Sequence, residues 1–106
     1  MEGEKMQIVE VFLPLDKGSG ARLDAEVIDG IVAGLADRFG GATAFTRSPA
    51  EGLWKQQQEV QRDRIVIVEV MVDDVDEAWW KDYRARLEEQ LEQEEVLIRA
   101  TPCRRL

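Results

Sequence analysis

Three short runs along the chain alternate between two kinds of position, as side chains do in β-strands. They are residues 7–13 (QIVEVFL), 64–72 (RIVIVEVMV) and 95–101 (EVLIRAT). One alternate set is wholly apolar and is expected to face a core: Val9, Val11, Leu13, Val66, Val68, Val70, Val72, Val96, Ile98 and Ala100.

The other alternate set is interrupted once in each run by a charged residue, namely Glu10, Glu69 or Arg99. Its remaining members are again apolar: Ile8, Phe12, Ile65, Ile67, Met71 and Leu97. A solvated face would be mostly polar, and an ordinary core face would carry no charge. We therefore expect this second face to be covered by something that tolerates charge.

Helical spacing of apolar residues predicts two helices between the strands. The first is expected to begin with Asp24 as N-cap and to end at Gly40-Gly41. Its apolar stripe is Ile28, Ile31, Val32, Leu35 and Phe39. Gly30 and Gly34 lie inside this helix, where close approach to the sheet would explain them.

The second helix is expected to begin after Val72, where Asp74 and Glu77 have capping-box spacing. Its predicted inward stripe is Val75, Trp79, Tyr83, Leu87 and Leu91, with Trp80 about 100° round and flanking it. Three i,i+4 ion pairs are expected on its outer side: Glu77–Lys81, Asp82–Arg86 and Arg84–Glu88. Its acidic end is either a solvated face or a docking site for a basic partner, and it comprises Glu88, Glu89, Glu92, Glu94 and Glu95.

A further short strand is expected at residues 42–47, followed by a long connector with an irregular hairpin at residues 48–61. The order strand–helix–strand–strand–helix–strand predicts a ferredoxin-like βαββαβ sandwich of the α+β class. Its four-stranded antiparallel sheet would have the order 4-1-3-2, with both helices on one face. No linker divides the chain, so residues 1–106 are expected to form a single domain. The bare face exceeds the apolar patch that a monomer usually exposes, which predicts a homodimer through this open sheet face.

Composition narrows the classes of function. The chain has 106 residues, a formal net charge of -8, a single cysteine, Cys103, and no histidine. The acidic balance disfavours nucleic acid and anionic membranes as partners, and no apolar run approaches the ~20 residues of a membrane span. The lone cysteine and the absence of a secretory signal predict a cytoplasmic location. Without histidine, the usual general base and metal ligand are missing, so no metal site and no cofactor are expected.

The candidate site residues are the charges on the open face. In the order 4-1-3-2, Arg99, Glu10 and Glu69 lie on adjacent strands of the same face, and Arg47 joins them if it faces this way. Paired carboxylates on a half-buried surface suit acid–base chemistry, which makes Glu10 and Glu69 catalytic candidates, and Arg99 an anion-binding one. The alternative is a charged cluster that sets partner and register across a dimer interface, with no chemistry.

The connector supplies two further binding candidates, Trp54 and Lys55. They could close over a ligand at the sheet edge, or Leu53 and Trp54 could plug the end of the core.

Three stretches resemble a family of small bacterial proteins whose activity is uncharacterised: FGGATAFTRSPAEGLWK (39–55), VEVMVDDVDEAWW (68–80) and IRATPCRRL (98–106). At the level of fold, the pattern is also similar to the dimeric α+β barrel proteins. These include cofactor-independent monooxygenases and small isomerases, which bind ligands between sheet and helices. Such enzymes often use a histidine, which this chain lacks.

Three functions remain open. The first is a dimeric small-molecule-binding or interaction module without catalysis. The second is a cofactor-independent enzyme, monooxygenase- or isomerase-like, that acts on a small aromatic or carbonyl substrate. The third is a subunit that docks a basic protein through Glu88, Glu92 and Glu95.

Overall fold

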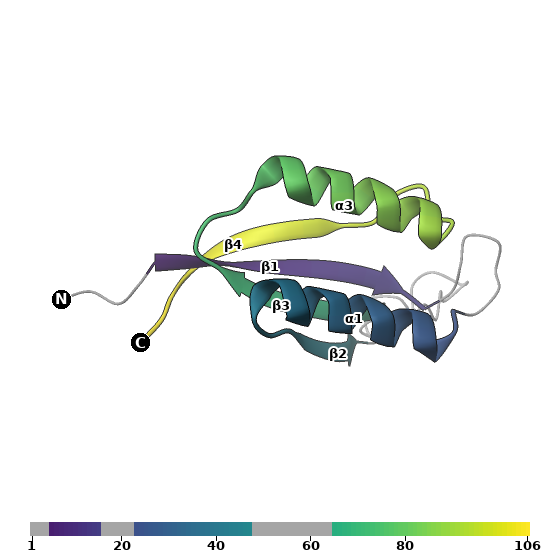
Figure 1. Ribbon diagram of the computed structural model, residues 1–106, viewed down its shortest axis with the longest axis horizontal. Coiled ribbons are helices and arrows are strands. Elements are labelled where there is room, and N and C mark those ends of the chain that lie inside the picture. The colour runs from purple at the N-terminus through teal and green to yellow at the C-terminus, as the bar shows by residue number, and fades with distance from the viewer. Residues whose placement is uncertain (1–4, 16–22, 48–64) are drawn as a thin grey trace, which may run out of the picture.

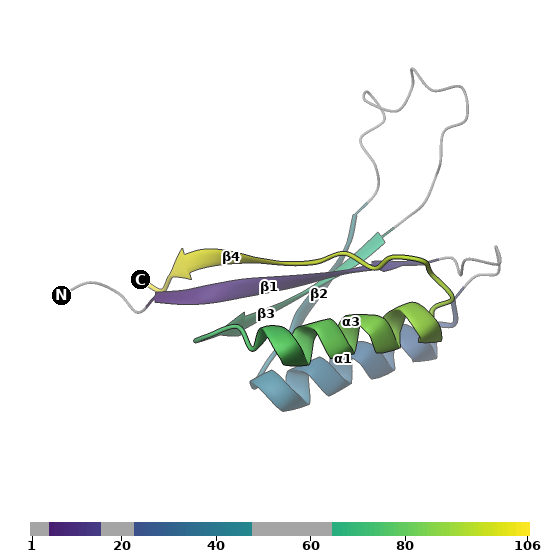
Figure 2. The same cartoon turned by 90° about the horizontal axis from the view of Figure 1, so that it is seen from above.

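The computed structural model describes residues 5–15, 23–47 and 65–106. Four strands form one antiparallel sheet in the order β2-β3-β1-β4, and both helices cover the same face of it (Figures 1 and 2). The ferredoxin-like α+β sandwich is thereby confirmed. Its elements are β1 (Lys5–Pro14), α1 (Ala25–Phe39), β2 (Thr43–Arg47), β3 (Ile65–Val72), α3 (Glu77–Gln90) and β4 (Ile98–Arg104).

The core lies between the sheet and the two helices. Val9, Val11 and Val68 of the central strands are buried there, against Leu35 of α1. The helix-facing set of strand residues is therefore the core face, as the alternation predicts. Ala100 is the exception: it is exposed, because β4 is an edge strand at the border of the helix layer.

The opposite face of the sheet has no helix over it among the described residues (Figure 2). Ile67 is nevertheless buried there, because its register partners on the two neighbouring strands are the large rings of Phe12 and Phe45. Three large apolar side chains remain exposed on this face: Phe45 is 37%, Met71 42% and Leu97 51% exposed. This surface is the open face of the sheet.

Helix α1 differs from expectation at two points. Asp24 is its N-cap by position, but its side chain makes no capping hydrogen bond. Gly30 and Gly34 are exposed, and a Cβ atom added at either would meet no atom within 4 Å. The explanation by close approach to the sheet is therefore wrong, since both glycines lie on the outer side of the helix. The helix ends at Gly40, whose φ of 80° is the left-handed conformation that glycine adopts at little cost.

Helix α3 begins later than the capping-box spacing suggests. Its N-cap is Asp76 rather than Asp74, and the Asp76 carboxylate accepts a hydrogen bond of 3.1 Å from the Trp79 backbone N–H. The inward residue of the tryptophan pair is Trp80, which is buried, whereas Trp79 is only half-buried. The predicted stripe is thus wrong at this end of the helix.

The far end of α3 is closed by backbone hydrogen bonds. Glu92 N–H donates to Glu89 C=O, and Gln93 N–H donates to Glu88 C=O, which together form a Schellman motif. Glu92 occupies the left-handed position with a φ of 55°. This turn sends the chain back toward the sheet, where β4 starts at Ile98 rather than at residue 95.

An aromatic cluster joins the two helices. Phe39 of α1 stacks on Trp80 with ring centroids 5.2 Å apart, and Trp79 stacks on Tyr83 at 4.9 Å. The Arg38 guanidinium lies 4.2 Å from the centroid of the Trp79 ring, within the range of a cation–π contact. The rings therefore pack α1 against α3, as expected for large apolar side chains.

The phenol of Tyr83 is expected to titrate late. Burial raises its pKa from 10.0 to about 12, with the nearby Arg86 guanidinium acting in the opposite direction. Because the folded state keeps this proton longer than the unfolded state, the contribution to stability is complete below pH 10.0 and is lost as the pH rises through about 12. Tyr83 is the single tyrosine of the chain, so phenolate absorbance after a rapid pH jump reports this group alone. Coincident titration curves for the folded and urea-unfolded chains would contradict this expectation.

Candidate functional site

Four residues form one polar row across the whole sheet on the open face. The strand register pairs Thr43 with Glu69, Glu69 with Glu10, and Glu10 with Arg99. Arg99 Nε donates a hydrogen bond of 2.7 Å to Glu10 Oε1. The structure thus brings together the three charged candidates that the alternation places on this face.

The two carboxylates of the row have different surroundings. The Glu10 side chain is 16% exposed and neutralised by Arg99, whose own side chain is 54% exposed. Glu69 is half-buried and forms no hydrogen bond or ion pair with any residue that the structure describes. The row therefore has two acids and one base, and the excess negative charge resides on Glu69.

Apolar side chains border the polar row. The register places Phe45, Ile67 and Phe12 in the next row along the strands, and the Phe12 ring centroid lies 5.0 Å from the Arg99 guanidinium carbon. A carboxylate beside aromatic rings is a favourable environment for an organic cation, because both groups attract positive charge. The Nε of Arg99 already donates to Glu10. Its two terminal nitrogens remain as donors for an anionic group of a ligand or of a second copy of the chain.

Metal binding has little support in the described part of the chain. No group of three or more carboxylate or thiol side chains lies close enough there to hold an ion. Glu10 and Glu69 supply only two carboxylates, and Arg99 occupies one of them.

The remaining predicted site residues are placed in part or not at all. Arg47 ends β2 opposite Ile65, in the same strand phase as Thr43 and Phe45, so its position belongs to the open face. Trp54 and Lys55, with the rest of the connector 48–61, lie outside the described residues.

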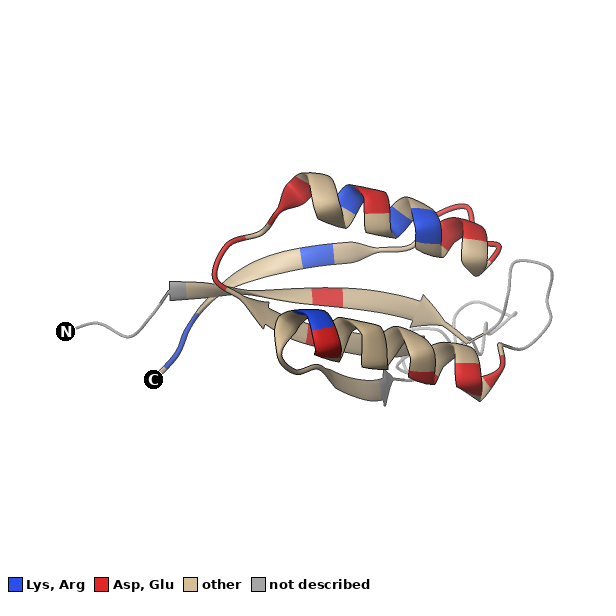
Figure 3. Ribbon diagram, in the orientation of Figure 1, with Lys and Arg blue, Asp and Glu red and all other residues tan. Residues whose placement is uncertain are grey.

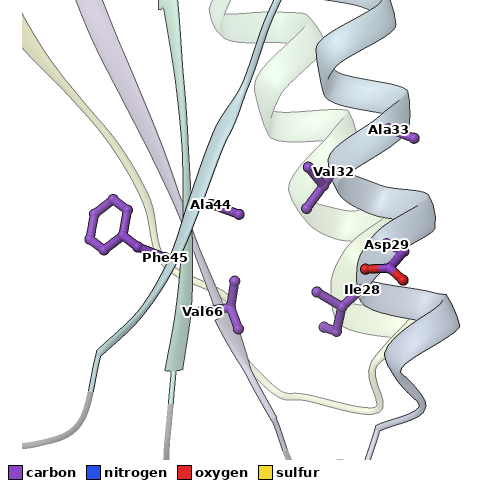
Figure 4. A pocket seen from close by; sticks show the side chains of 7 residues that line it. All are labelled: Ile28, Asp29, Val32, Ala33, Ala44, Phe45 and Val66. Carbon is purple, nitrogen blue, oxygen red and sulfur yellow. The ribbon is translucent and has the colours of Figure 1, made fainter.

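A cavity that the sequence does not reveal lies on the other side of the sheet, between α1 and β2 (Figure 4). Its volume is about 380 Å³. Figure 4 shows Ile28 and Val32 of α1 facing Ala44 and Val66 of the sheet, whereas the Phe45 ring points away toward the open face. Among the described residues that line it, Asp29 is the one that carries a charge.

One residue of the acidic end of α3, Glu88, makes contacts within the fold. Glu88 Oε2 accepts a hydrogen bond of 2.9 Å from the Val96 backbone N–H and lies 3.7 Å from Arg84 Nε. The Arg84–Glu88 and Asp82–Arg86 pairs form as expected. Glu77 and Lys81 form no ion pair within the described ranges. Since Glu88 tethers the start of β4 to the helix, it is a structural residue as well as a member of the acidic end.

Comparison with known proteins supports the fold and little more. No family model and no curated protein matches the chain. Among solved structures, the chain is similar to a phage SAM lyase in complex with S-methyl-5′-thioadenosine, with a TM-score of 0.60. The identity is 16%, over 95% of this chain and 84% of that one, so the likeness shows a shared α+β fold. The resemblance to a family of small bacterial proteins stays a prediction.

Neither helix in the described ranges has the length and apolar character needed to cross a membrane.

Proposed function

We propose that this protein is a small-molecule-binding module that self-associates through its open face. Its ligand-binding residues are Glu69, Glu10 and Arg99, and Arg47, Trp54 and Lys55 remain further candidates. The observation that supports this most directly is the polar row itself, since one of its carboxylates has no partner among the described residues and the row lies among exposed apolar side chains. The single cysteine fits the cytoplasm as its location.

The class of ligand that suits the row is an organic cation with an apolar or aromatic body. Glu69 supplies the negative charge, and Phe45 and Phe12 supply ring faces in the adjacent row. The structural neighbour is a SAM lyase, and SAM carries a positively charged sulfonium group next to an adenosine. SAM is therefore the first probe to use, with uncharged S-methyl-5′-thioadenosine as its comparison.

Isothermal titration calorimetry tests this assignment. We expect SAM to bind the native chain, and the substitution Glu69→Gln to weaken binding by at least about tenfold, because it removes the charge that the sulfonium meets. Asp37→Asn, an exposed carboxylate on α1, is the matched control and should leave the affinity unchanged. S-methyl-5′-thioadenosine should bind more weakly than SAM. If the native chain does not bind SAM, or if both variants behave alike, the cation site is refuted.

The alternative function is a cofactor-independent enzyme on the same row. Two carboxylates directly opposite each other on neighbouring strands favour it, because one can act as acid–base group while the other keeps its charge. Glu10 or Glu69 would then move the proton and Arg99 would anchor an anionic group on a small aromatic or carbonyl substrate. Incubation of the chain with SAM, followed by mass spectrometry, adds a test for turnover. Loss of SAM that depends on Glu69 would replace the binding module with the enzyme.

A further inference from the structure

The outer edge of β4 is a surface separate from the open face. β4 is the last strand of the sheet order, and it pairs with β1 alone. Phe12 N–H donates to Leu97 C=O at 3.0 Å, so residues 12 and 97 form a hydrogen-bonded pair of this antiparallel ladder. By alternation, Arg99, Thr101 and Cys103 also direct their backbone groups toward β1.

The intervening residues of β4 direct their backbone groups away from the sheet. Ile98 and Ala100 each present a free N–H and C=O at this edge, and Pro102 presents a C=O without an N–H. Pro102 is tolerated here because its missing N–H would point outward rather than into the ladder. The edge therefore offers backbone N–H donors at Ile98 and Ala100, and it offers none at Pro102.

A groove runs between this part of β4 and helix α3. Its volume is about 180 Å³, and Ala100 and Ile98 line it together with Trp80. On the helix side it is lined by three charged residues, Glu77, Lys81 and Arg84. Alternate side chains of a strand added to β4 would enter this groove, because they point to the same face as Ile98 and Ala100.

The lining of this groove has more basic than acidic residues, although the chain as a whole is acidic: Lys81, Arg84 and Arg99 stand against Glu77. Arg38 apart, the basic residues marked in Figure 3 all belong to α3, to β4 or to the residue after it, and the side chains of Lys5 and Arg47 lie outside the described part of the structure. Lys81 has no ion-pair partner in the described ranges, and neither have Arg104 and Arg105 at the end of β4. Unpaired cations beside free backbone donors favour an acidic occupant.

We propose that the edge of β4 binds an extended acidic segment of a partner protein by strand addition. Ile98 and Ala100 supply the backbone hydrogen bonds, and Lys81 receives a carboxylate of the segment in the groove. Main-chain bonds give such a complex its affinity, and the alternate side chains in the groove give it selectivity.

A second copy of this chain fits the edge less well. If β4 paired with β4 of another copy around Ala100, then Ile98 would face the second copy's Pro102. One of the two hydrogen bonds of that pair would be missing, because proline has no N–H to donate.

The first experiment measures binding of a short fluorescein-labelled peptide of alternating valine and glutamate by fluorescence anisotropy. We expect the native chain to bind it and not to bind the valine–lysine counterpart. Ala100→Pro should weaken binding by at least about tenfold, because it removes an outward donor without touching the ladder to β1. Ala100→Val, which keeps the N–H, is the matched control and should bind normally.

Two surface charges extend the test to variants that leave the strand intact. Lys81→Glu should weaken binding, whereas Glu77→Gln should strengthen it, because Glu77 opposes an acidic peptide at the same groove. Glu69→Gln should bind the peptide normally, which separates this proposal from the open face.

Three results would overturn the proposal. One is a native chain that does not bind the valine–glutamate peptide. Another is binding that neither Ala100→Pro nor Lys81→Glu reduces. The third is a dimer that Ala100→Pro converts to a monomer, because a second copy would then be the occupant of the edge.

Discussion

Replacing Trp80 with alanine is expected to destabilise the folded chain by about 3–5 kcal/mol. The Trp80 side chain is 5% exposed and contacts three other aromatic rings, including Phe39 in a stacked arrangement with Trp80 at 5.2 Å. Alanine would leave a cavity at the junction of α1 and α3, because these two helices are joined there largely by rings. Urea denaturation followed by circular dichroism measures the loss. For a domain of this size it is a large part of the total free energy of unfolding, about 5–15 kcal/mol.

Trp79→Ala provides the matched control, since it removes the same side chain one residue away. Trp79 is half-buried, so its removal gives up less packing, together with the contact of Arg38 at 4.2 Å. We expect the destabilisation by Trp79→Ala to be clearly the smaller of the two. Equal effects of the two substitutions, or a larger effect of Trp79→Ala, would contradict the assignment of Trp80 as the inward residue.

The choice between the two tryptophans shows why the predicted stripe failed. The predicted positions lie four residues apart throughout, and each such step turns by 40° about the helix axis, since one residue turns by about 100°. The predicted stripe also begins at Val75, which precedes the helix and is not part of it. Counting back seven residues from the buried Leu87 leads to Trp80, which is the helical spacing that the structure shows.

The helices and strands were predictable because alternation and helical spacing each depend on local sequence alone, and the topology followed from their order and right-handed crossovers. The open face was predictable for the same reason, and so was the presence of Glu10, Glu69 and Arg99 on it. Their alignment in one row was not, because a shift of two residues between strands leaves every side chain on the same face and changes only its partners. Register is set by packing across the whole sheet, as in the row of Phe12, Ile67 and Phe45.

Features that depend on the distance between elements also escaped the sequence. The cavity beside Ala44 exists because α1 lies far enough from β2 to leave space, and no residue pattern encodes this separation. The full length of β4 also escaped the sequence. Pro102 reads as the end of a strand, yet β4 continues to Arg104 because the missing N–H faces outward.

Leu97→Glu is expected to weaken self-association of the native chain by at least about a hundredfold, because it places a charge without a partner inside a buried apolar contact. Leu97 is 51% exposed on the open face and flanks Phe12, whose backbone N–H donates a hydrogen bond to the Leu97 C=O. The fold of the single chain should survive, since half of the side chain faces solvent. Light scattering at micromolar concentration should show a dimer for the native chain and a monomer for the variant.

Leu106→Glu introduces the same charge at a fully exposed leucine beyond the end of β4, which makes it the control for a change in net charge. It should remain a dimer, because Leu106 lies outside the patch formed by Phe45, Met71 and Leu97. A monomeric native chain would contradict the proposal that a second copy covers the apolar open face. The ligand would then be the remaining group that could cover it. If Leu97→Glu stays dimeric, the contact lies elsewhere on the protein.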